Sequence, residues 1–197
     1  MSKAYIDPGE AKDCALACFE QGFLASLNWV NAESIKPVSG GIVTRPDYIL
    51  WEKPQIYPKS EGNPNQMVDL AVAGAEAVTY LRIGWGVQLA RMRNVLPRDW
   101  KGTIAKPVHH MRLWPILTPA ERALFEAGTW EYIQENAHAI AMGKSPSYSA
   151  KVTDLLDATA LGCYDLGRLP GPLAGKVQAL KAARSSHRTK GRRYGKR

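Results

Sequence analysis

The chain has 197 residues, enough for one domain with a substantial core, and 45% of them are hydrophobic, too many for a disordered protein. No apolar run approaches the roughly 20 residues that span a bilayer. The first residues, Met1 to Asp7, also lack the apolar stretch of a signal peptide. We therefore expect a cytoplasmic protein with no membrane partner.

The net charge of +8 is unevenly distributed along the chain. Residues 169–197 contain nine Lys or Arg and no Asp or Glu, so residues 1–168 hold 17 basic and 18 acidic groups. The sequence thus predicts a nearly neutral domain, 1–168, and a basic tail, 169–197, with a polyanionic partner. The end of this tail is too polar to fold alone. Its expected phosphate contacts are Arg188, Lys190, Arg192 and Arg193.

Cys14, Cys18 and Cys163 are odd in number and form no CxxC pair, which argues against both a zinc site and a disulfide framework. Buried free thiols are the better interpretation, because free cysteine is among the most buried residue types.

The first third of the chain predicts strands separated by turns. Apolar or alternating runs give four expected strands, over residues 3–6, 13–19, 23–30 and 48–51. The first strand ends at the turn Asp7-Pro8-Gly9, and Gln21-Gly22 offers a tight turn between the second and third. Residues 31–46 and 55–64 are expected to be loops, because both are rich in Pro and Gly.

Helices dominate the rest of the chain. Apolar residues at helical spacing predict a helix over 65–81, and residues 87–95 are assigned as a strand, as a βαβ crossover requires. Thr118-Pro119-Ala120-Glu121 is a capping box that starts a helix, which continues with a break near Gly128 to about Met142. A last helix covers about 152–168. This order of elements predicts a mixed α/β domain.

Four carboxylates stand where metal-dependent chemistry would need them. Asp7 and Glu52 each end a predicted strand, where ligands bind in open α/β sheets. Asp154 and Asp157 are three residues apart on one face of the last helix. Carboxylates that meet repel each other and need a cation. Mg²⁺ suits such oxygen-only sites, Mn²⁺ can substitute, and two ions hold the attacking and leaving oxygens of a phosphodiester.

Each of these carboxylates also has a purely structural interpretation. An Asp before Pro-Gly is often a turn residue, a Glu after an apolar strand is often a solvated strand end, and a DxxD pair on a helix is commonly surface charge. Their order along the chain favours a shared site: an Asp after strand one, a Glu after the fourth strand, and DxxD on the final helix.

This order resembles the RuvC-type Holliday-junction resolvases of the RNase H-like nucleases. The residues that carry the resemblance are Ile6-Asp7-Pro8-Gly9, Trp51-Glu52, and Asp154 to Gly162, with Pro97 to Gly102 similar to a basic loop of phage-type relatives. The resemblance implies an RNase H-like mixed five-stranded sheet flanked by helices. It also implies a homodimer that cleaves both strands of a four-way DNA junction, with the four carboxylates as metal ligands. The long proline-rich loops and the basic tail depart from the family pattern.

A mixed basic and aromatic stretch follows Pro97. Its members are Arg98, Trp100, Lys101, Lys106, His109, His110 and Arg112. We expect phosphate contacts from Arg98, Lys101 and Lys106, and Trp100 either stacks on an unpaired base or lies in the core. His109 and His110 have no partners at metal-ligand spacing and are left out of the catalytic set.

Three alternatives remain open at this level. A nuclease of the same fold could act on flaps, DNA ends or RNA–DNA hybrids. A nucleotide-binding ATPase or sugar-kinase relative would need a second glycine-rich phosphate loop, which Gly40-Gly41 and Gly84-Gly86 do not supply convincingly. A non-catalytic DNA-binding protein would carry its acidic residues as surface charge.

Overall fold

A six-stranded mixed sheet forms the centre of the computed structural model, which describes residues 1–9, 13–40, 45–54, 64–146 and 150–171. In chain order the strands are β1 (Ser2–Asp7), β2 (Cys14–Glu20), β3 (Phe23–Val30), β4 (Ile35–Gly40), β5 (Tyr48–Glu52) and β6 (Met92–Val95). Their order across the sheet is β4-β3-β2-β1-β5-β6.

The pairing of the strands defines the fold class. Strands β1 to β4 form an antiparallel meander, and β5 and β6 then extend the sheet in parallel from β1. The expected mixed α/β fold is therefore confirmed, and three antiparallel strands followed by two parallel ones are consistent with the RNase H-like arrangement. The expected count of five strands is wrong by one, because β4 adds an edge strand.

Strand β4 lies in the segment 31–46, for which the sequence predicts a loop. Pro37 pairs with Asn28 of β3, and the register shifts by a bulge between Leu27 and Asn28. Proline is compatible with an edge strand, because its missing N–H is not needed by a further neighbour. Pro37 and Gly40 of this segment therefore lie in the edge strand.

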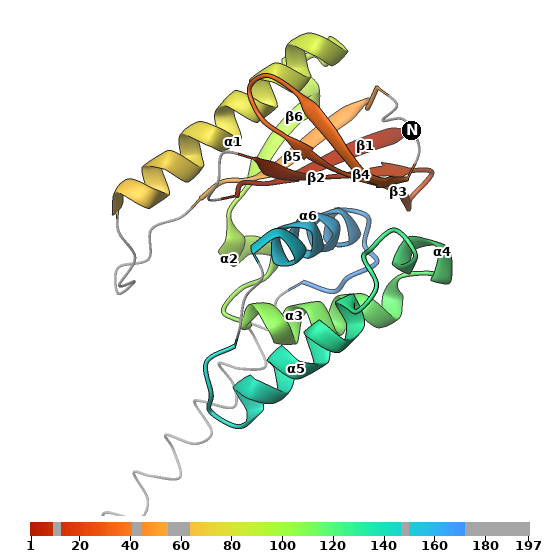
Figure 1. Cartoon of the computed structure of the whole chain (residues 1–197). Helices are drawn as coiled ribbons and strands as arrows, with labels where there is room; N and C mark the ends of the chain where they lie inside the picture. The colour runs from red at the N-terminus through yellow and green to blue at the C-terminus, as the bar shows by residue number, and fades with distance from the viewer. Residues whose placement is uncertain (10–12, 41–44, 55–63, 147–149, 172–197) are drawn as a thin grey trace, which may run out of the picture.

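The helices cover both faces of the sheet. They are α1 (Pro64–Trp85), α2 (Pro97–Trp100), α3 (Lys106–Leu113), α4 (Pro119–Arg122), α5 (Thr129–Ala141) and α6 (Ala150–Asp165), with short 3₁₀ turns η1 (Leu89–Arg91) and η2 (Trp114–Ile116). Helix α1 lies on one face, whereas α6 lies on the other, with α3 and α5 in an outer layer beneath it (Figure 1).

The predicted helices 65–81 and 152–168 are both found, with shifted ends. The predicted strand 87–95 is reduced to β6 at its C-terminal end, because η1 precedes it. The helix predicted from Thr118 is two helices, α4 and α5, and the second begins directly after Gly128.

Helix α6 is buried on all sides where it crosses the sheet. The side chains from Leu156 to Leu161 are all 0% exposed. Gly162 permits this close packing, because a Cβ there would collide with the rings of Phe19 and Tyr5 on the sheet. The position of α6 on β1 and β2 is therefore fixed by small residues.

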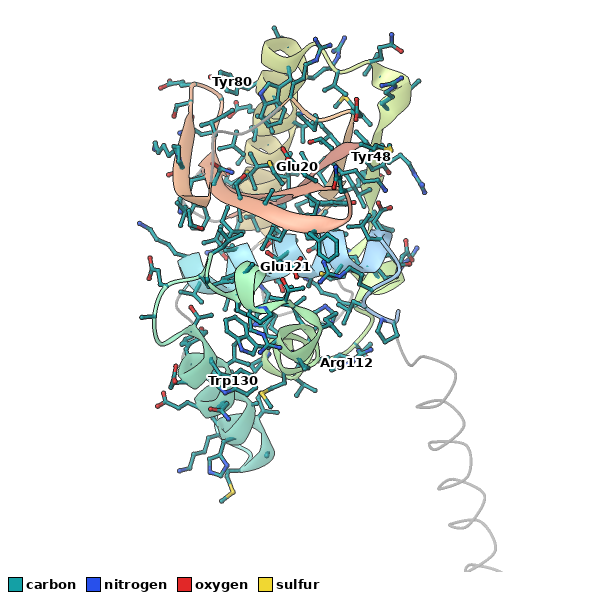
Figure 2. All side chains as sticks on the ribbon, turned by 90° about the vertical axis from the view of Figure 1, so that its right-hand side faces the viewer. Glu20, Tyr48, Tyr80, Arg112, Glu121 and Trp130 are labelled. Atoms are coloured by element: carbon teal, nitrogen blue, oxygen red, sulfur yellow. The ribbon has the colours of Figure 1, made fainter. Side chains whose placement is uncertain are left out.

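The predicted capping box at the start of α4 is confirmed, and its Glu121 has a second structural role. Its carboxylate accepts hydrogen bonds from the backbone N–H groups of Leu24 and Thr118, both at 2.7 Å, and from both terminal nitrogens of Arg168, at 2.6 and 2.8 Å. Figure 2 shows Glu121 where the sheet meets the helical layer. This one buried side chain ties α4, β3 and the turn after α6 together.

All three cysteines are buried free thiols, as predicted. Among the described helices, none has both the length and the apolar character needed to cross a bilayer. Leu169 is buried in the core, one residue beyond the expected domain boundary. The boundary itself stays a prediction, because residues 172–197 lie outside the described residues.

Candidate metal-binding and catalytic site

The first carboxylate, Asp7, ends β1 and is 4% exposed. The turn that follows is tightly packed: a Cβ on Gly9 would lie 2.5 Å from the carbonyl oxygen of Asp13 and 3.1 Å from a carboxylate oxygen of Asp154. Glycine at this position therefore lets the end of β1 approach the N-terminal half of α6. The Asp-Pro-Gly turn and the DxxD helix meet in space.

The second carboxylate, Glu52, ends the neighbouring parallel strand β5. Ile6 pairs with Trp51 in the register of these strands, so Asp7 and Glu52 follow adjacent positions at the same edge of the sheet. The indole N–H of Trp100 donates a hydrogen bond to Oε2 of Glu52 at 2.7 Å and fixes its orientation.

Helix α6 supplies Asp154 and Asp157. Asp157 is fully buried, and its Oδ1 accepts a hydrogen bond from the Nε2 of His110 at 2.8 Å. His110 lies on α3, the helix beneath α6, and is itself 1% exposed. Asp157 is thus held between the sheet and the outer helical layer.

Two lysine ammonium groups lie among these carboxylates. Lys101 Nζ is 3.1 Å from Glu52 Oε2 and 3.5 Å from Asp157 Oδ2. Lys106 Nζ is 2.9 Å from Asp157 Oδ2 and 3.9 Å from Asp154 Oδ1. Each ammonium therefore bridges carboxylates from two different positions, and both share one oxygen of Asp157.

The carboxylates of this cluster differ in how readily they ionise. Burial, followed by the negative charges of Glu52 and Asp157, raises the pKa of Asp7 well above its ordinary value. Burial also raises the pKa of Glu52, although Lys101 opposes this effect. For Asp157, burial is outweighed by Lys101, Lys106 and His110, which hold its pKa well below the ordinary value. The neighbouring cations therefore stabilise the ionised form of Asp157, whereas burial and the neighbouring carboxylates disfavour the ionised form of Asp7.

The lysines respond to the same charges. Burial alone would lower the pKa of each, yet Asp157 above all raises the pKa of Lys101 and of Lys106 above the ordinary lysine value. Both side chains are therefore cations at neutral pH, and the cluster is an array of alternating charges.

The donor set fits a hard divalent cation in its chemistry. Its four carboxylates are oxygen ligands, which Mg²⁺ prefers, and the raised pKa of Asp7 marks a place where added positive charge is favourable. In the arrangement that the described residues adopt, no three acidic, His or Cys side chains lie close enough together to hold an ion. The lysine ammonium groups lie between the carboxylates instead.

The residues predicted to contact DNA fall into three groups. Lys101 and Lys106 lie in the carboxylate cluster, whereas Arg98 is exposed and lies 3.5 Å from Asp99. Trp100 is 1% exposed, so the stacking of its ring on a base is not supported; the ring lies in the core and orients Glu52. The four tail residues, Arg188, Lys190, Arg192 and Arg193, lie outside the described residues.

Sequence reasoning missed the histidines of α3. His110 bonds the central carboxylate, while His109 is fully buried against the edge of Trp100, and burial lowers its pKa to about 4. The available signal was their position in a helix that begins at Lys106-Pro107, because proline in the first turn is typical of a helix start.

The sequence matches no known protein family, and no curated protein matches it. Solved structures similar to it include Thermus thermophilus RuvC and T. thermophilus RuvC in complex with a Holliday junction substrate. Both are 14% identical, and each match covers 87% of this chain and 99% of the RuvC chain. The TM-scores are 0.37 and 0.34 respectively.

Proposed function

We propose that this chain is a metal-dependent endonuclease that resolves four-way DNA junctions by paired phosphodiester hydrolysis. The observation that carries the proposal is a cluster at one edge of the mixed sheet, in which carboxylates from β1, β5 and α6 interact with one another and with Lys101 and Lys106. Carboxylates gathered in this way attract cations, and phosphodiester hydrolysis at a metal site needs no nucleophilic side chain.

The site residues have distinct roles in this proposal. Asp7, Glu52, Asp154 and Asp157 would hold two Mg²⁺ ions, for which Mn²⁺ can substitute. The ions would supply an activated water and stabilise the charge that develops on the phosphate. Trp100 and His110 hold Glu52 and Asp157 in position, because each donates a hydrogen bond from a buried ring.

Cleavage of a labelled mobile four-way junction, with the metal varied, tests this proposal. We expect symmetrical paired nicks with Mg²⁺ or Mn²⁺ and none in EDTA. Asp7→Asn should abolish cleavage while junction binding persists. The matched control is Asp13→Asn, a carboxylate of the same turn that pairs with Lys36 at the surface. Failure of both metals to give cleavage by the wild type would remove the enzymatic function.

A panel of labelled branched DNA and RNA–DNA hybrid substrates distinguishes two alternative functions from junction resolution. Cleavage restricted to RNA–DNA hybrids or to other branched DNA would indicate another nuclease of the fold. Non-catalytic DNA binding is favoured by one observation, namely that the lysines already neutralise part of the cluster. Junction binding without cleavage under any metal condition would establish it.

The basic tail is included in the proposal as a sequence-independent contact to the DNA backbone, in the cytoplasm of the host cell. Truncation after Pro170 should weaken junction binding and flatten its dependence on salt, because nine cations are removed. An unchanged salt slope would exclude the tail from binding.

Paired cleavage needs two sites, and the proposal therefore includes a homodimer. The outer face of α1 offers a surface for a second copy: Val68, Val72 and Ile83 are exposed there, and two hollows of ≈ 530 and ≈ 380 Å³ meet at Ala75. Two α1 helices packed antiparallel about a two-fold axis would place Val68 opposite Ile83 and Val72 opposite Thr79. The same apolar stripe would then contribute to the interface from both subunits.

The oligomeric state in solution tests this part of the proposal. Light scattering should give a dimer for the wild type and a monomer for Ile83→Lys. Met142→Lys is the control, because Met142 is also an exposed apolar residue but lies after α5. A monomeric wild type at concentrations that support cleavage would contradict the dimer.

A further inference from the structure

The oxygens that a metal ion would use at the centre of the acidic cluster already have cationic or N–H partners. Asp157 Oδ1 is bonded by His110, and its Oδ2 lies 2.9 Å from Lys106 Nζ and 3.5 Å from Lys101 Nζ. Both oxygens of Glu52 also contact Lys101, at 3.1 and 3.2 Å. An ion that binds these carboxylates must therefore displace an ammonium group.

Charge leads to the same conclusion. The four carboxylates of the cluster carry four negative charges when ionised, and the two lysines supply two positive charges. Two divalent ions alone would neutralise the carboxylates completely. Keeping both ammonium groups in place as well would leave a surplus of positive charge beside the fully buried Asp157, which is strongly unfavourable in such surroundings.

The lysines are able to move away from the carboxylates. Lys106 is the first residue of α3, and its side chain is 40% exposed, so its ammonium can reach the surface without rearrangement of the backbone. Lys101 directly follows α2, and its side chain is 12% exposed. A phosphodiester bound at the cluster would offer both ammonium groups a new anionic partner.

We propose that Lys101 and Lys106 are built-in counter-ions, which hold the acidic cluster together without metal and compete with divalent ions for its carboxylates. Metal loading then requires their displacement, and a DNA phosphate that accepts the displaced ammonium groups favours loading. Metal and DNA backbone bind with positive coupling, which is reciprocal: each raises the affinity for the other. This inference rests on the proposed function, because it assumes that the carboxylates are metal ligands.

Mn²⁺ binding without DNA tests the competition directly. Titration calorimetry and Mn²⁺ electron paramagnetic resonance are applied to the wild type, Lys106→Met and Lys101→Met. We expect about tenfold tighter binding in each lysine variant, the effect of one lost competing ion pair. The control is Lys3→Met, which removes a lysine 2.8 Å from Asp165, outside the cluster. Its Mn²⁺ affinity should equal that of the wild type.

A second measurement uses the wild-type protein and does not depend on the folding of the variants. Acylation of lysines, followed by mass spectrometry, should show that Mn²⁺ increases the reactivity of Lys101 and Lys106 severalfold relative to Lys3. Mn²⁺ that binds without tighter binding in the variants and without a change in reactivity would overturn the inference. That result would leave junction cleavage, and hence the proposed function, intact. Absence of Mn²⁺ binding in every variant would overturn both.

Discussion

Asp7 and Asp157 belong to one cluster but have opposite electrostatic surroundings. The same change from carboxylate to amide should therefore alter the free energy of unfolding in opposite directions when no metal is present. Asp157 faces Lys101, Lys106 and His110, which lower its pKa. Burial and the other carboxylates raise the pKa of Asp7. We expect Asp157→Asn to destabilise the protein and Asp7→Asn to stabilise it.

The magnitudes follow from the contacts. Removal of one partner from a buried ion pair typically costs about 3–5 kcal/mol. Because the Lys106 side chain is partly exposed and can become hydrated, we expect about 3 kcal/mol for Asp157→Asn. For Asp7→Asn we expect a gain in stability at pH 7, because the amide carries no charge that burial and the neighbouring carboxylates would disfavour.

Urea unfolding in EDTA measures both values, with Asp13→Asn as the control, expected within about 0.5 kcal/mol of the wild type. The pH dependence has a defined sign. Because its pKa is raised in the folded state, Asp7 takes up a proton on folding, so the advantage of Asp7→Asn should shrink as the pH falls toward the ordinary aspartate pKa. Equal destabilisation by Asp7→Asn and Asp157→Asn would refute the reasoning.

Three further changes test the supports of the site. Trp100→Phe removes the buried hydrogen bond to Glu52, so it should destabilise the protein by about 1–3 kcal/mol and lower kcat for cleavage. An unchanged kcat would exclude a positioning role for Trp100. Gly162→Ala introduces a methyl group against the rings on β1 and β2, so thermal unfolding should show a loss of about 1–3 kcal/mol, and an unchanged Tm would contradict the packing. Arg168 and the other donors lower the pKa of Glu121 to about 2 despite its burial. The stability that this carboxylate contributes should therefore be lost as the pH falls from about 4.5 to about 2. In acid titrations followed by circular dichroism, Glu121→Gln should not show this loss.

Much of the sheet could be predicted from sequence because local patterns determine it. Apolar runs that end in an acidic residue indicated β1 and β5, and the helical period indicated α1 and α6. Three of these elements, β1, β5 and α6, carry all four carboxylates of the cluster. The convergence of Asp7 and Glu52 follows from the parallel pairing of β1 with β5, a long-range contact across the intervening strands β2 to β4.

Helix α3 could not be predicted, because much of its buried face is polar. The inner face of α3 presents His109 and His110, which give no apolar period. The bridging positions of Lys101 and Lys106 depend on contacts with Glu52 and with α6, far away along the chain. Basic residues in a sequence give no sign of whether their partner is a phosphate or a carboxylate of the same protein.

The two sides of the acidic cluster differ in what keeps them in place. Asp7 and Glu52 end strands joined by backbone hydrogen bonds, whose spacing no side-chain substitution can easily change. Asp157 lies on a helix positioned by the volumes of the side chains around it. Substitutions around α6 can therefore change the distance between Asp157 and the carboxylates at the strand ends, whereas substitutions in the strands change it much less. Directed evolution toward a different ion should accumulate its substitutions in the layer beneath α6, while the strands stay unchanged.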